Sequence, residues 1–167
     1  MNNQVQAELK KIFNGRFSTS ESTRANYARG EDTYDPVLSK AVVFPETNEE
    51  VSKILSLCNE HKIPVVPFGT GTSLEGNVVG NDKGITISLE KMNKILSVNA
   101  EDFDCRVQAC VTKEQLNEYL REDGVFFPID PGANAAIGGM ASTSASGTMA
   151  CLLYTSDAAD DRGCVGG

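Results

Sequence analysis

A glycine-rich stretch, residues 69–76, constrains the fold of this 167-residue chain more than any other feature. It reads Gly-Thr-Gly-Thr-Ser-Leu-Glu-Gly and follows a short apolar run, residues 63–67, that contains two prolines. The run predicts a strand at the edge or end of a sheet, because proline cannot donate to a central ladder. Small residues after the strand let backbone N–H groups converge on an anion, and threonine and serine hydroxyls add further donors. Taken alone, the stretch is equally typical of a tight surface turn.

Two common phosphate-binding motifs do not fit this stretch. A dinucleotide fingerprint beginning at Gly69 requires glycine at position 74, where the chain has Leu74. A nucleoside-triphosphate loop beginning at Gly71 does reach Gly76, but Asn77 follows where that motif has lysine. A kinase or NTPase is therefore disfavoured.

A second segment, residues 130–147, is also rich in glycine, serine, threonine and alanine. The longest uncharged stretch, residues 131–156, overlaps this segment, and its composition predicts a loop and not a membrane helix. Two separate glycine-rich segments that carry little charge suggest one long phosphate-bearing ligand held through backbone amides. A pyrophosphate cofactor is the natural candidate.

Three amphipathic helices are predicted, while residues 18–31 show no clear pattern. The first dozen residues place Val5, Leu9 and Ile12 on one side of a helix. Capping boxes that begin at Thr47 and Thr112 predict the starts of the other two helices. The apolar stripes are Val51, Ile54, Leu55 and Cys58 in the second helix and Leu116, Tyr119 and Leu120 in the third, which Gly124 would end.

Short β-rich runs alternate with these helices. Strands are predicted at residues 41–44, where Pro45 stops the run, and at residues 84–89. Two more, at residues 95–98 and 105–111, flank an acidic turn.

Charge and cysteine usage exclude several classes of function. The chain has 15 Lys and Arg against 23 Asp and Glu, and its net charge of −8 opposes a nucleic acid partner. Five cysteines without a CxxC pair favour a reducing compartment, and no secretory signal is visible, so we expect a cytoplasmic protein, either free or peripheral at the membrane. The single histidine, His61, has no second histidine or Cys/Asp cluster beside it, so no metal site is expected.

Four motifs carry a family resemblance. They are Val-Phe-Pro-Glu-Thr-Asn-Glu-Glu-Val at 43–51, Pro-Val-Val-Pro-Phe-Gly-Thr-Gly-Thr-Ser-Leu-Glu-Gly at 64–76, Phe-Pro-Ile-Asp-Pro-Gly-Ala at 127–133 and Ala-Ser-Thr-Ser-Ala-Ser-Gly-Thr at 141–148. Over residues 24–150 the chain resembles FAD-binding domains of the vanillyl-alcohol-oxidase/p-cresol-methylhydroxylase type. Within that type it is most similar to the D-lactate dehydrogenase (cytochrome) branch and the glycolate oxidase FAD subunit. The resemblance implies an α+β fold, a truncated two-lobed FAD-binding domain of the p-cresol-methylhydroxylase type with FAD extended between the lobes.

The same resemblance implies which residues contact FAD. In the first loop they are Pro67, Phe68, Gly69, Thr70, Gly71, Thr72, Ser73, Gly76 and Asn77. In the second segment they are Pro131, Gly132, Ile137, Gly138, Gly139, Thr143, Ser146 and Gly147. In relatives whose flavin is attached covalently through this loop, a histidine follows the last loop glycine, whereas this chain has Thr72. The flavin is therefore expected to be bound non-covalently.

The resemblance also divides the chain. Residues 1–37 form an N-terminal helical segment, residues 38–150 an incomplete FAD-binding domain, and residues 151–167 a tail that departs from the relatives and looks like translated adaptor sequence. Relatives have glycine in the turn at residues 109–112, so Cys110 is expected to introduce a small strain, with a reactive thiol as the alternative. Asp130 is expected to cap the turn that follows it.

The implied function is oxidation of a D-2-hydroxy acid, D-lactate before others, to the 2-keto acid, with electrons passed to a cytochrome or quinone. Oxidation of glycolate or D-2-hydroxyglutarate, a flavin enzyme of ether-lipid synthesis, and an FAD-binding fragment without activity are the alternatives. No catalytic residue is assigned, because the family's substrate-binding residues lie beyond the region of resemblance.

Overall fold

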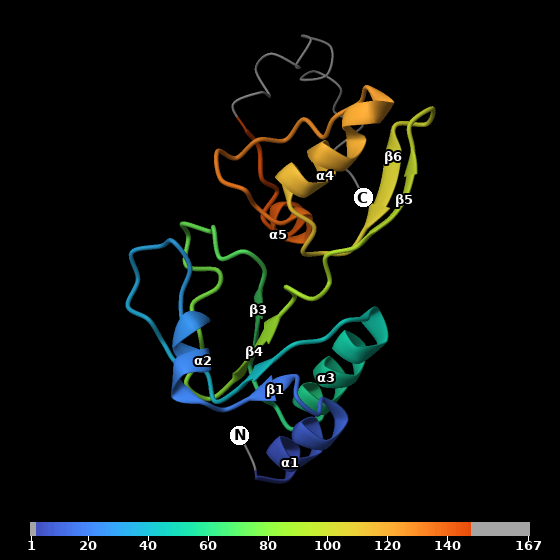
Figure 1. The fold of residues 1–167 in the computed structure, drawn as a ribbon. Coiled ribbons are helices and arrows are strands. Elements are labelled where there is room, and N and C mark those ends of the chain that lie inside the picture. The colour runs from blue at the N-terminus through green and yellow to red at the C-terminus, as the bar shows by residue number, and fades with distance from the viewer. Residues whose placement is uncertain (1–2, 148–167) are drawn as a thin grey trace.

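The computed structural model describes residues 3–147, which form two lobes (Figure 1). The first lobe (residues 3–92) contains a four-stranded sheet with helices beside it, and the second lobe (residues 93–147) contains a two-stranded hairpin with helices. The first lobe is built from α1 (Asn3–Ile12), β1 (Phe17–Ser18), α2 (Glu21–Asn26), β2 (Val42–Val43), α3 (Asn48–Glu60), β3 (Val65–Phe68) and β4 (Ile85–Ser88). The second lobe is built from β5 (Ile95–Asn99), β6 (Asp104–Val107), α4 (Lys113–Leu120), the 3-10 turn η1 (Arg121–Asp123) and α5 (Ile137–Ser142). This arrangement confirms the predicted two-lobed α+β fold.

The sheet of the first lobe has the strand order β1-β2-β4-β3. β2, β4 and β3 run parallel, with Val42 opposite Thr86 and Val65 opposite Ile85, whereas β1 is antiparallel to β2. β3 lies at the edge of the sheet, as its prolines predict. Because parallel strands end at the same side of a sheet, the loop after β3 opens where ligands bind in open α/β sheets.

The core of the first lobe lies between α1, α3 and the sheet. Val5, Leu9 and Phe13 are fully buried together with Ile54 of α3. The prediction that Ile12 belongs to this stripe is wrong, because Ile12 is 43% exposed. Phe13 follows Leu9 by four residues and so occupies the side of the helix that faces the core.

Threonine caps begin α3 and α4, as predicted. Thr47 Oγ1 accepts a hydrogen bond from the N–H of Glu50 (3.3 Å), and Thr112 Oγ1 accepts one from the N–H of Gln115 (3.2 Å). The segment after α4 ends at Gly124 in a left-handed conformation (φ +70°), close to where the sequence predicts the helix end.

The buried stripes of α3 and α4 are narrower than predicted. Leu55 is 46% exposed and Tyr119 is 59% exposed, so their assignment to the core is wrong. Each helix contacts the core of one lobe only, which leaves the flank of its apolar stripe in solvent. The buried residues of the two helices are Ile54, Cys58, Leu116 and Leu120.

Three regions differ from the sequence-based expectation. Residues 18–31 include the short helix α2, and β6 ends at Val107, earlier than expected. The prediction of a loop for residues 131–156 is wrong in part, because they include α5, and residues 148–156 lie outside the described residues. The start of α5 is tied to the chain before α4, since the N–H of Ile137 donates to the Val111 carbonyl (2.8 Å). That tie is long-range, which is why local composition does not reveal the helix.

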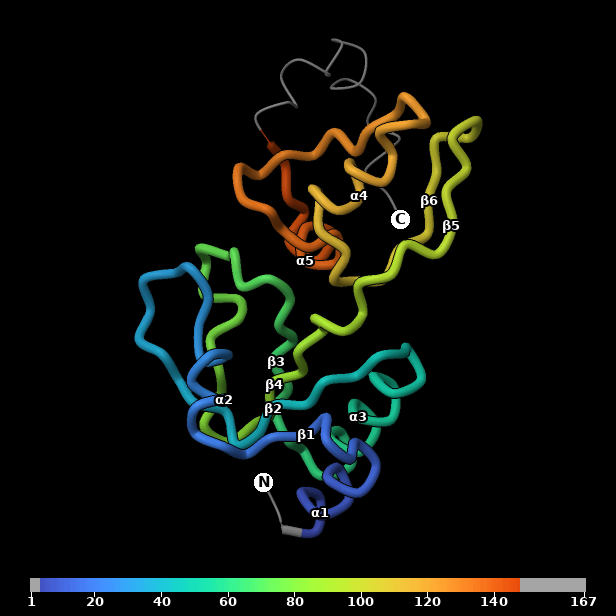
Figure 2. The backbone as a smooth tube through the Cα atoms, viewed as in Figure 1, coloured from blue at the N-terminus to red at the C-terminus, as the bar shows by residue number. Residues whose placement is uncertain are grey.

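A long connection, residues 27–41, runs beside the segment that follows β3 (Figure 2). Within residues 3–147 no helix is long and apolar enough to cross a membrane. The same residues contain no group of three or more His, Cys, Asp or Glu side chains that could hold a metal ion. The predicted tail, residues 151–167, lies outside the described residues.

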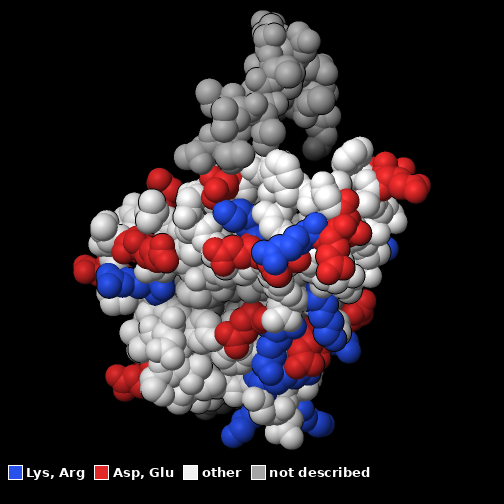
Figure 3. All heavy atoms as spheres, turned by 45° about the horizontal axis from the view of Figure 1, so that its top comes forward, with Lys and Arg blue, Asp and Glu red and all other residues white. Residues whose placement is uncertain are grey.

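An ion-pair network joins the turn after α1 to the start of α3. Arg16 donates two hydrogen bonds to the Glu50 carboxylate, Nη1 to Oε2 and Nη2 to Oε1, each 2.6 Å long. The backbone N–H of Glu46 also donates to Glu50 Oε2 (2.7 Å), and the Glu46 carboxylate forms a longer ion pair with Lys91 (3.7 Å). Acidic and basic side chains likewise lie next to each other on the face shown in Figure 3. The Arg16 hydrogen bonds, with help from this N–H, lower the pKa of Glu50 from 4.5 to about 2.

The Arg16–Glu50 pair makes stability depend on pH. The folded pKa of Glu50 lies below its unfolded value, so its contribution is present above pH 4.5 and is lost as the pH falls toward 2. In urea titrations, the chain is expected to lose about 2–3 kcal/mol more unfolding free energy between about pH 6 and about pH 2 than the Glu50→Gln variant does. Glu8→Gln, an exposed change of the same kind, is the matched control. Equal pH dependence in the chain and in Glu50→Gln would contradict the prediction.

Candidate cofactor-binding site

The glycine-rich loop begins at the carboxyl end of β3. Phe68 is buried at that end, and its carbonyl accepts a hydrogen bond from the N–H of Leu89 (2.8 Å). After it, the backbone N–H groups of residues 70–73 have no acceptor within residues 3–147. The hydroxyl oxygens of Thr70 and Thr72 lie 3.4 Å apart, so both hydroxyls are on one side of the loop. The loop thus presents a run of unpaired donors, which suits an anion.

Two glycines of the loop are required by conformation and packing. Gly71 and Gly76 have φ angles of +76° and +71°, a region that side chains disfavour. A Cβ on Gly71 would lie 2.8 Å from Cζ of Phe68, and a Cβ on Gly76 would lie 2.7 Å from two ring carbons of Tyr34. Glycine at these two positions therefore shapes the loop whether or not a ligand is bound.

Ser73 and Asn77, both predicted contacts, are bonded to each other. Asn77 Nδ2 donates to Ser73 Oγ (3.1 Å), and the N–H of Glu75 donates to the same oxygen (3.4 Å). The Asn77 amide thereby closes the loop, while the proton of the Ser73 hydroxyl stays available for an acceptor.

Asp130 caps the turn that opens the second segment, as predicted. Its Oδ1 accepts hydrogen bonds from Lys113 Nζ (2.9 Å) and from the N–H of Gly132 (3.0 Å). These bonds, that of Lys113 foremost, hold the pKa of Asp130 below its usual 3.8. Gly147 packs against the backbone of Asp130, where a Cβ would collide with the carbonyl. Of the predicted contacts in this region, Gly132 therefore lies at the Asp130 carboxylate and Gly147 at the Asp130 backbone.

The start of α5 offers one unpaired amide. The N–H groups of Ile137 and Gly138 donate to the carbonyls of Val111 and Ala109, both at 2.8 Å. A Cβ on Gly138 would lie 2.8 Å from that of Ala109, so this glycine serves packing. Gly139 differs, because its N–H has no acceptor in the described part of the chain and a Cβ there would meet no atom within 4 Å. Gly139 is the position on α5 that is open to a ligand.

The two glycine-rich segments meet where β3 ends and α5 begins. A Cβ on Gly69 would lie 3.4 Å from Cβ of Ala136, and Figure 1 shows α5 above the end of β3. At the other end of α5, Thr143 uses its hydroxyl to donate to the Gly139 carbonyl (3.0 Å), and Ser146 is exposed. The structure therefore places the first loop beside the start of α5.

The meeting point fits the pyrophosphate group of a dinucleotide cofactor. The unpaired N–H groups of residues 70–73 and of Gly139 are available, and the threonine hydroxyls add donors. None of the predicted contact residues is Lys or Arg, so aligned amide dipoles would balance the charge of the phosphates. The absence of a side chain at Gly69 allows the loop to pack closely against Ala136. The open space at Gly139 leaves room for such a ligand next to the backbone.

An aromatic and acidic cluster supports the loop from behind. The Tyr27 ring packs edge-on against Phe68 (5.0 Å between centroids) and Phe44 (5.6 Å), and its hydroxyl donates to Glu90 (2.6 Å). Burial, then the Glu90 hydrogen bond, raises the pKa of Tyr27 to about 12. Burial also raises the pKa of the nearby Cys110 thiol, to which the charge of Glu90 adds. Cys110 is thus a protonated core residue near neutral pH, which argues against the reactive-thiol alternative.

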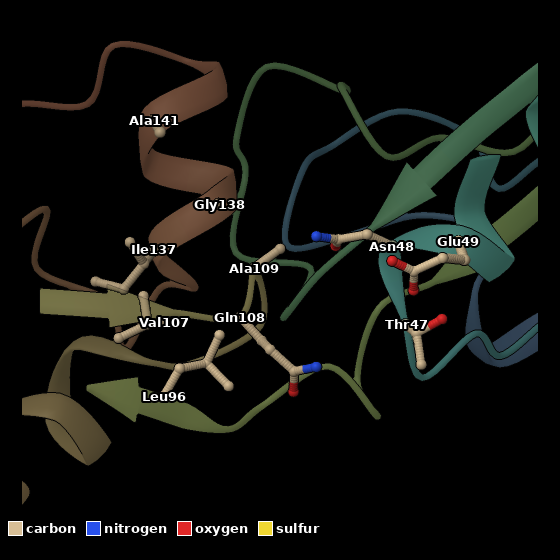
Figure 4. Close-up of a pocket in the computed structure, with 10 residues that line it drawn as sticks. All are labelled: Thr47, Asn48, Glu49, Leu96, Val107, Gln108, Ala109, Ile137, Gly138 and Ala141. Atoms are coloured by element: carbon tan, nitrogen blue, oxygen red, sulfur yellow. The ribbon is translucent and has the colours of Figure 1, made fainter.

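A cavity of about 440 Å³ lies between the start of α3 and the second lobe (Figure 4). Two predicted contact residues, Ile137 and Gly138, line it, but the first loop does not. The residues that the sequence analysis missed here come from separate elements, and no local motif marks them. They are Thr47, Asn48, Glu49, Leu96, Val107, Gln108, Ala109 and Ala141.

The chain is similar to several curated enzymes over most of its length. It is 44% identical to the probable mitochondrial D-lactate dehydrogenase of Danio rerio, over 83% of this chain and 28% of that protein. It is 39% identical to the mitochondrial D-lactate dehydrogenase [cytochrome] of Arabidopsis thaliana, over 89% of this chain and 27% of that protein. A D-2-hydroxyglutarate dehydrogenase of Pseudomonas putida is 34% identical, over 83% and 14%. The chain thus spans less than a third of each relative.

Solved structures share the fold. An alkyldihydroxyacetonephosphate synthase superposes with a TM-score of 0.81 at 20% identity, over 90% of this chain and 31% of that one. p-Cresol methylhydroxylase superposes with a TM-score of 0.63 at 23% identity, over 76% and 25%. The family model described as FAD binding domain matches residues 39–160, which include both glycine-rich segments. The match covers more than half of the chain and shows that the chain belongs to the FAD binding domain family.

Proposed function

We propose that the chain is the FAD-binding part of an enzyme that oxidises a D-2-hydroxy acid, D-lactate before others, and passes the electrons to a cytochrome or quinone. The observation that carries this proposal is the run of unpaired N–H groups at residues 70–73, in a loop whose Gly69 packs against Ala136 at the start of α5. The relatives from Danio rerio and Arabidopsis thaliana are D-lactate dehydrogenases by name, which supports D-lactate as the substrate. FAD supplies the two-electron acceptor in such a reaction.

This chain's own residues would bind and orient the cofactor. The N–H groups of residues 70–73 and of Gly139 would donate to the phosphates, with the hydroxyls of Thr70 and Thr72 on the same side. The other predicted contacts of the two segments would shape the loop and line the remainder of the cofactor. We also propose that residues 38–150 carry this FAD-binding domain, preceded by the N-terminal segment 1–37. The adaptor-like origin of residues 151–167 remains a hypothesis.

Titration of the purified chain with FAD tests the binding proposal. Saturable quenching of flavin fluorescence is expected, and inorganic pyrophosphate should compete because the donors at residues 70–73 bind the phosphates. A chain that is folded by circular dichroism and yet binds neither FAD nor pyrophosphate would refute the proposal.

The mode of attachment has its own test. Because Thr72 stands where covalent relatives have histidine, acid precipitation of the loaded chain should leave all flavin in the supernatant. Free FAD is identified there by its mass. Flavin that stays in the pellet after washing in denaturant would show a covalent bond and contradict this prediction.

A second candidate is a chain that binds FAD without turnover. The similarity to proteins of more than three times the matched length favours it, since the chain spans 28% and 27% of the D-lactate dehydrogenases. D-lactate-dependent reduction of an artificial dye by the loaded chain separates the two. D-2-hydroxyglutarate and glycolate serve as competing substrates in the same assay, applied also to any longer protein that contains this sequence. The compartment stays a prediction, and the names of the two relatives place those proteins in mitochondria.

A further inference from the structure

One continuous segment covers the back of the glycine-rich loop. We name residues 27–34 the backing segment; in Figure 2 it runs alongside the chain that follows β3. Its first residue, Tyr27, packs against Phe68 at the start of the loop (5.0 Å between centroids). Its last residue, Tyr34, packs against Gly76 at the end of the loop, where a Cβ would lie 2.7 Å from the ring. Support of the loop therefore extends over its whole length.

The centre of the backing segment holds one loop carbonyl. The N–H of Glu31 donates to the Gly71 carbonyl oxygen (2.8 Å). Gly30 lies so close that a Cβ on it would collide with the same oxygen. The carbonyl of Gly71 is thus fixed toward the backing segment.

This fixed carbonyl determines where the next amide points. In a trans peptide the C=O and the following N–H point in opposite directions, and the described residues contain no cis peptide. The N–H of Thr72 therefore points away from the backing segment. It has no acceptor within the described ranges, so it is free for a ligand. Rotation of this one peptide would replace the donor with a carbonyl oxygen, which repels phosphate.

Asp32 holds the backing segment in this position. The residue is buried (6% exposed), and its two carboxylate oxygens accept hydrogen bonds from the N–H groups of Gly30 and Tyr34, both at 3.0 Å. Hydrogen bonds to a buried charged group are the stronger kind, and their loss would leave both N–H groups without this acceptor. We infer that Asp32 is a positioning residue for FAD, acting through Glu31 and Gly71 to direct the Thr72 N–H toward a cofactor phosphate. This inference rests on the proposed FAD site and assigns to it a residue outside the predicted contacts.

The experiment compares three variants of the full chain. Asp32→Ala removes both acceptors, Asp32→Asn keeps the side-chain size and one acceptor oxygen, and Asp35→Ala removes an exposed carboxylate three residues away as the matched control. We expect FAD affinity to fall about tenfold in Asp32→Ala and about threefold in Asp32→Asn, and to stay unchanged in Asp35→Ala. Affinity is measured well below each melting temperature, so that lower stability alone does not change it.

A second readout follows the amide itself. In ¹H–¹⁵N spectra, the Thr72 signal of the chain should shift on addition of inorganic pyrophosphate, and this shift should shrink in Asp32→Asn. The same spectra show whether a variant is folded, and Asp32→Asn decides the test if Asp32→Ala loses the fold. Folded Asp32 variants with unchanged FAD affinity and an unchanged Thr72 shift would overturn the inference while the FAD site stands. A folded unsubstituted chain that binds neither FAD nor pyrophosphate would overturn both.

Discussion

Replacement of Leu9 by alanine is expected to lower the free energy of unfolding by about 2–5 kcal/mol, because it opens a cavity in a core that cannot fully collapse. Leu9 is completely buried, and it lies between Val5 and Phe13 against the α3 side of the sheet. Urea denaturation followed by circular dichroism measures the change. For a domain of marginal stability, such a loss is enough to leave much of the chain unfolded.

Ile12→Ala is the matched control for this change. It lies on the same helix and has a side chain of similar size, but it is 43% exposed, so we expect a loss below about 1 kcal/mol. The pair of variants thereby tests whether α1 is part of the core of the first lobe. Equal effects of Leu9→Ala and Ile12→Ala would show that α1 does not pack as the structure describes.

Elements that depend on neighbouring residues could be predicted from the sequence. The caps at Thr47 and Thr112 are contacts within four residues, so the sequence contains all the information they need. The same holds for β3, since proline alone restricts it to an edge. The glycines at 71 and 76 also show in the sequence, because a left-handed backbone selects glycine at each position separately.

Features that depend on distant residues could not be predicted. Helical periodicity places Ile12 and Tyr119 next to the buried stripe, but only the neighbouring elements decide which flank is covered. Composition alone does not predict α5, because the N–H of Ile137 at its start donates to the carbonyl of Val111, which lies before α4. The backing segment has no periodic pattern at all, and its importance follows from the contact between Glu31 and Gly71, forty residues apart.

Replacement of Gly71 by alanine is expected to lower both the stability and the FAD affinity of the chain. The φ angle of +76° costs an alanine about 1–2 kcal/mol, and its Cβ would lie 2.8 Å from the Phe68 ring, which adds about 1–3 kcal/mol of overpacking. The ring cannot move aside freely, because Tyr27 packs against it and is itself held by Glu90. The loop must therefore shift, and we expect FAD binding to weaken at least about tenfold.

Gly15→Ala separates the two causes of this effect. Gly15 has the same φ angle of +76°, but a Cβ there would meet no atom within 4 Å, so only the backbone cost of about 1–2 kcal/mol applies. Urea denaturation and FAD titration of both variants should show a smaller loss of stability and no loss of affinity for Gly15→Ala. If Gly71→Ala lost stability and kept its FAD affinity, the loop could shift without consequence for the cofactor, and phosphate binding by the amides of residues 70–73 would be contradicted. If both variants lost the same stability, the Phe68 ring would be free to move, and the cluster behind the loop would not hold it in place.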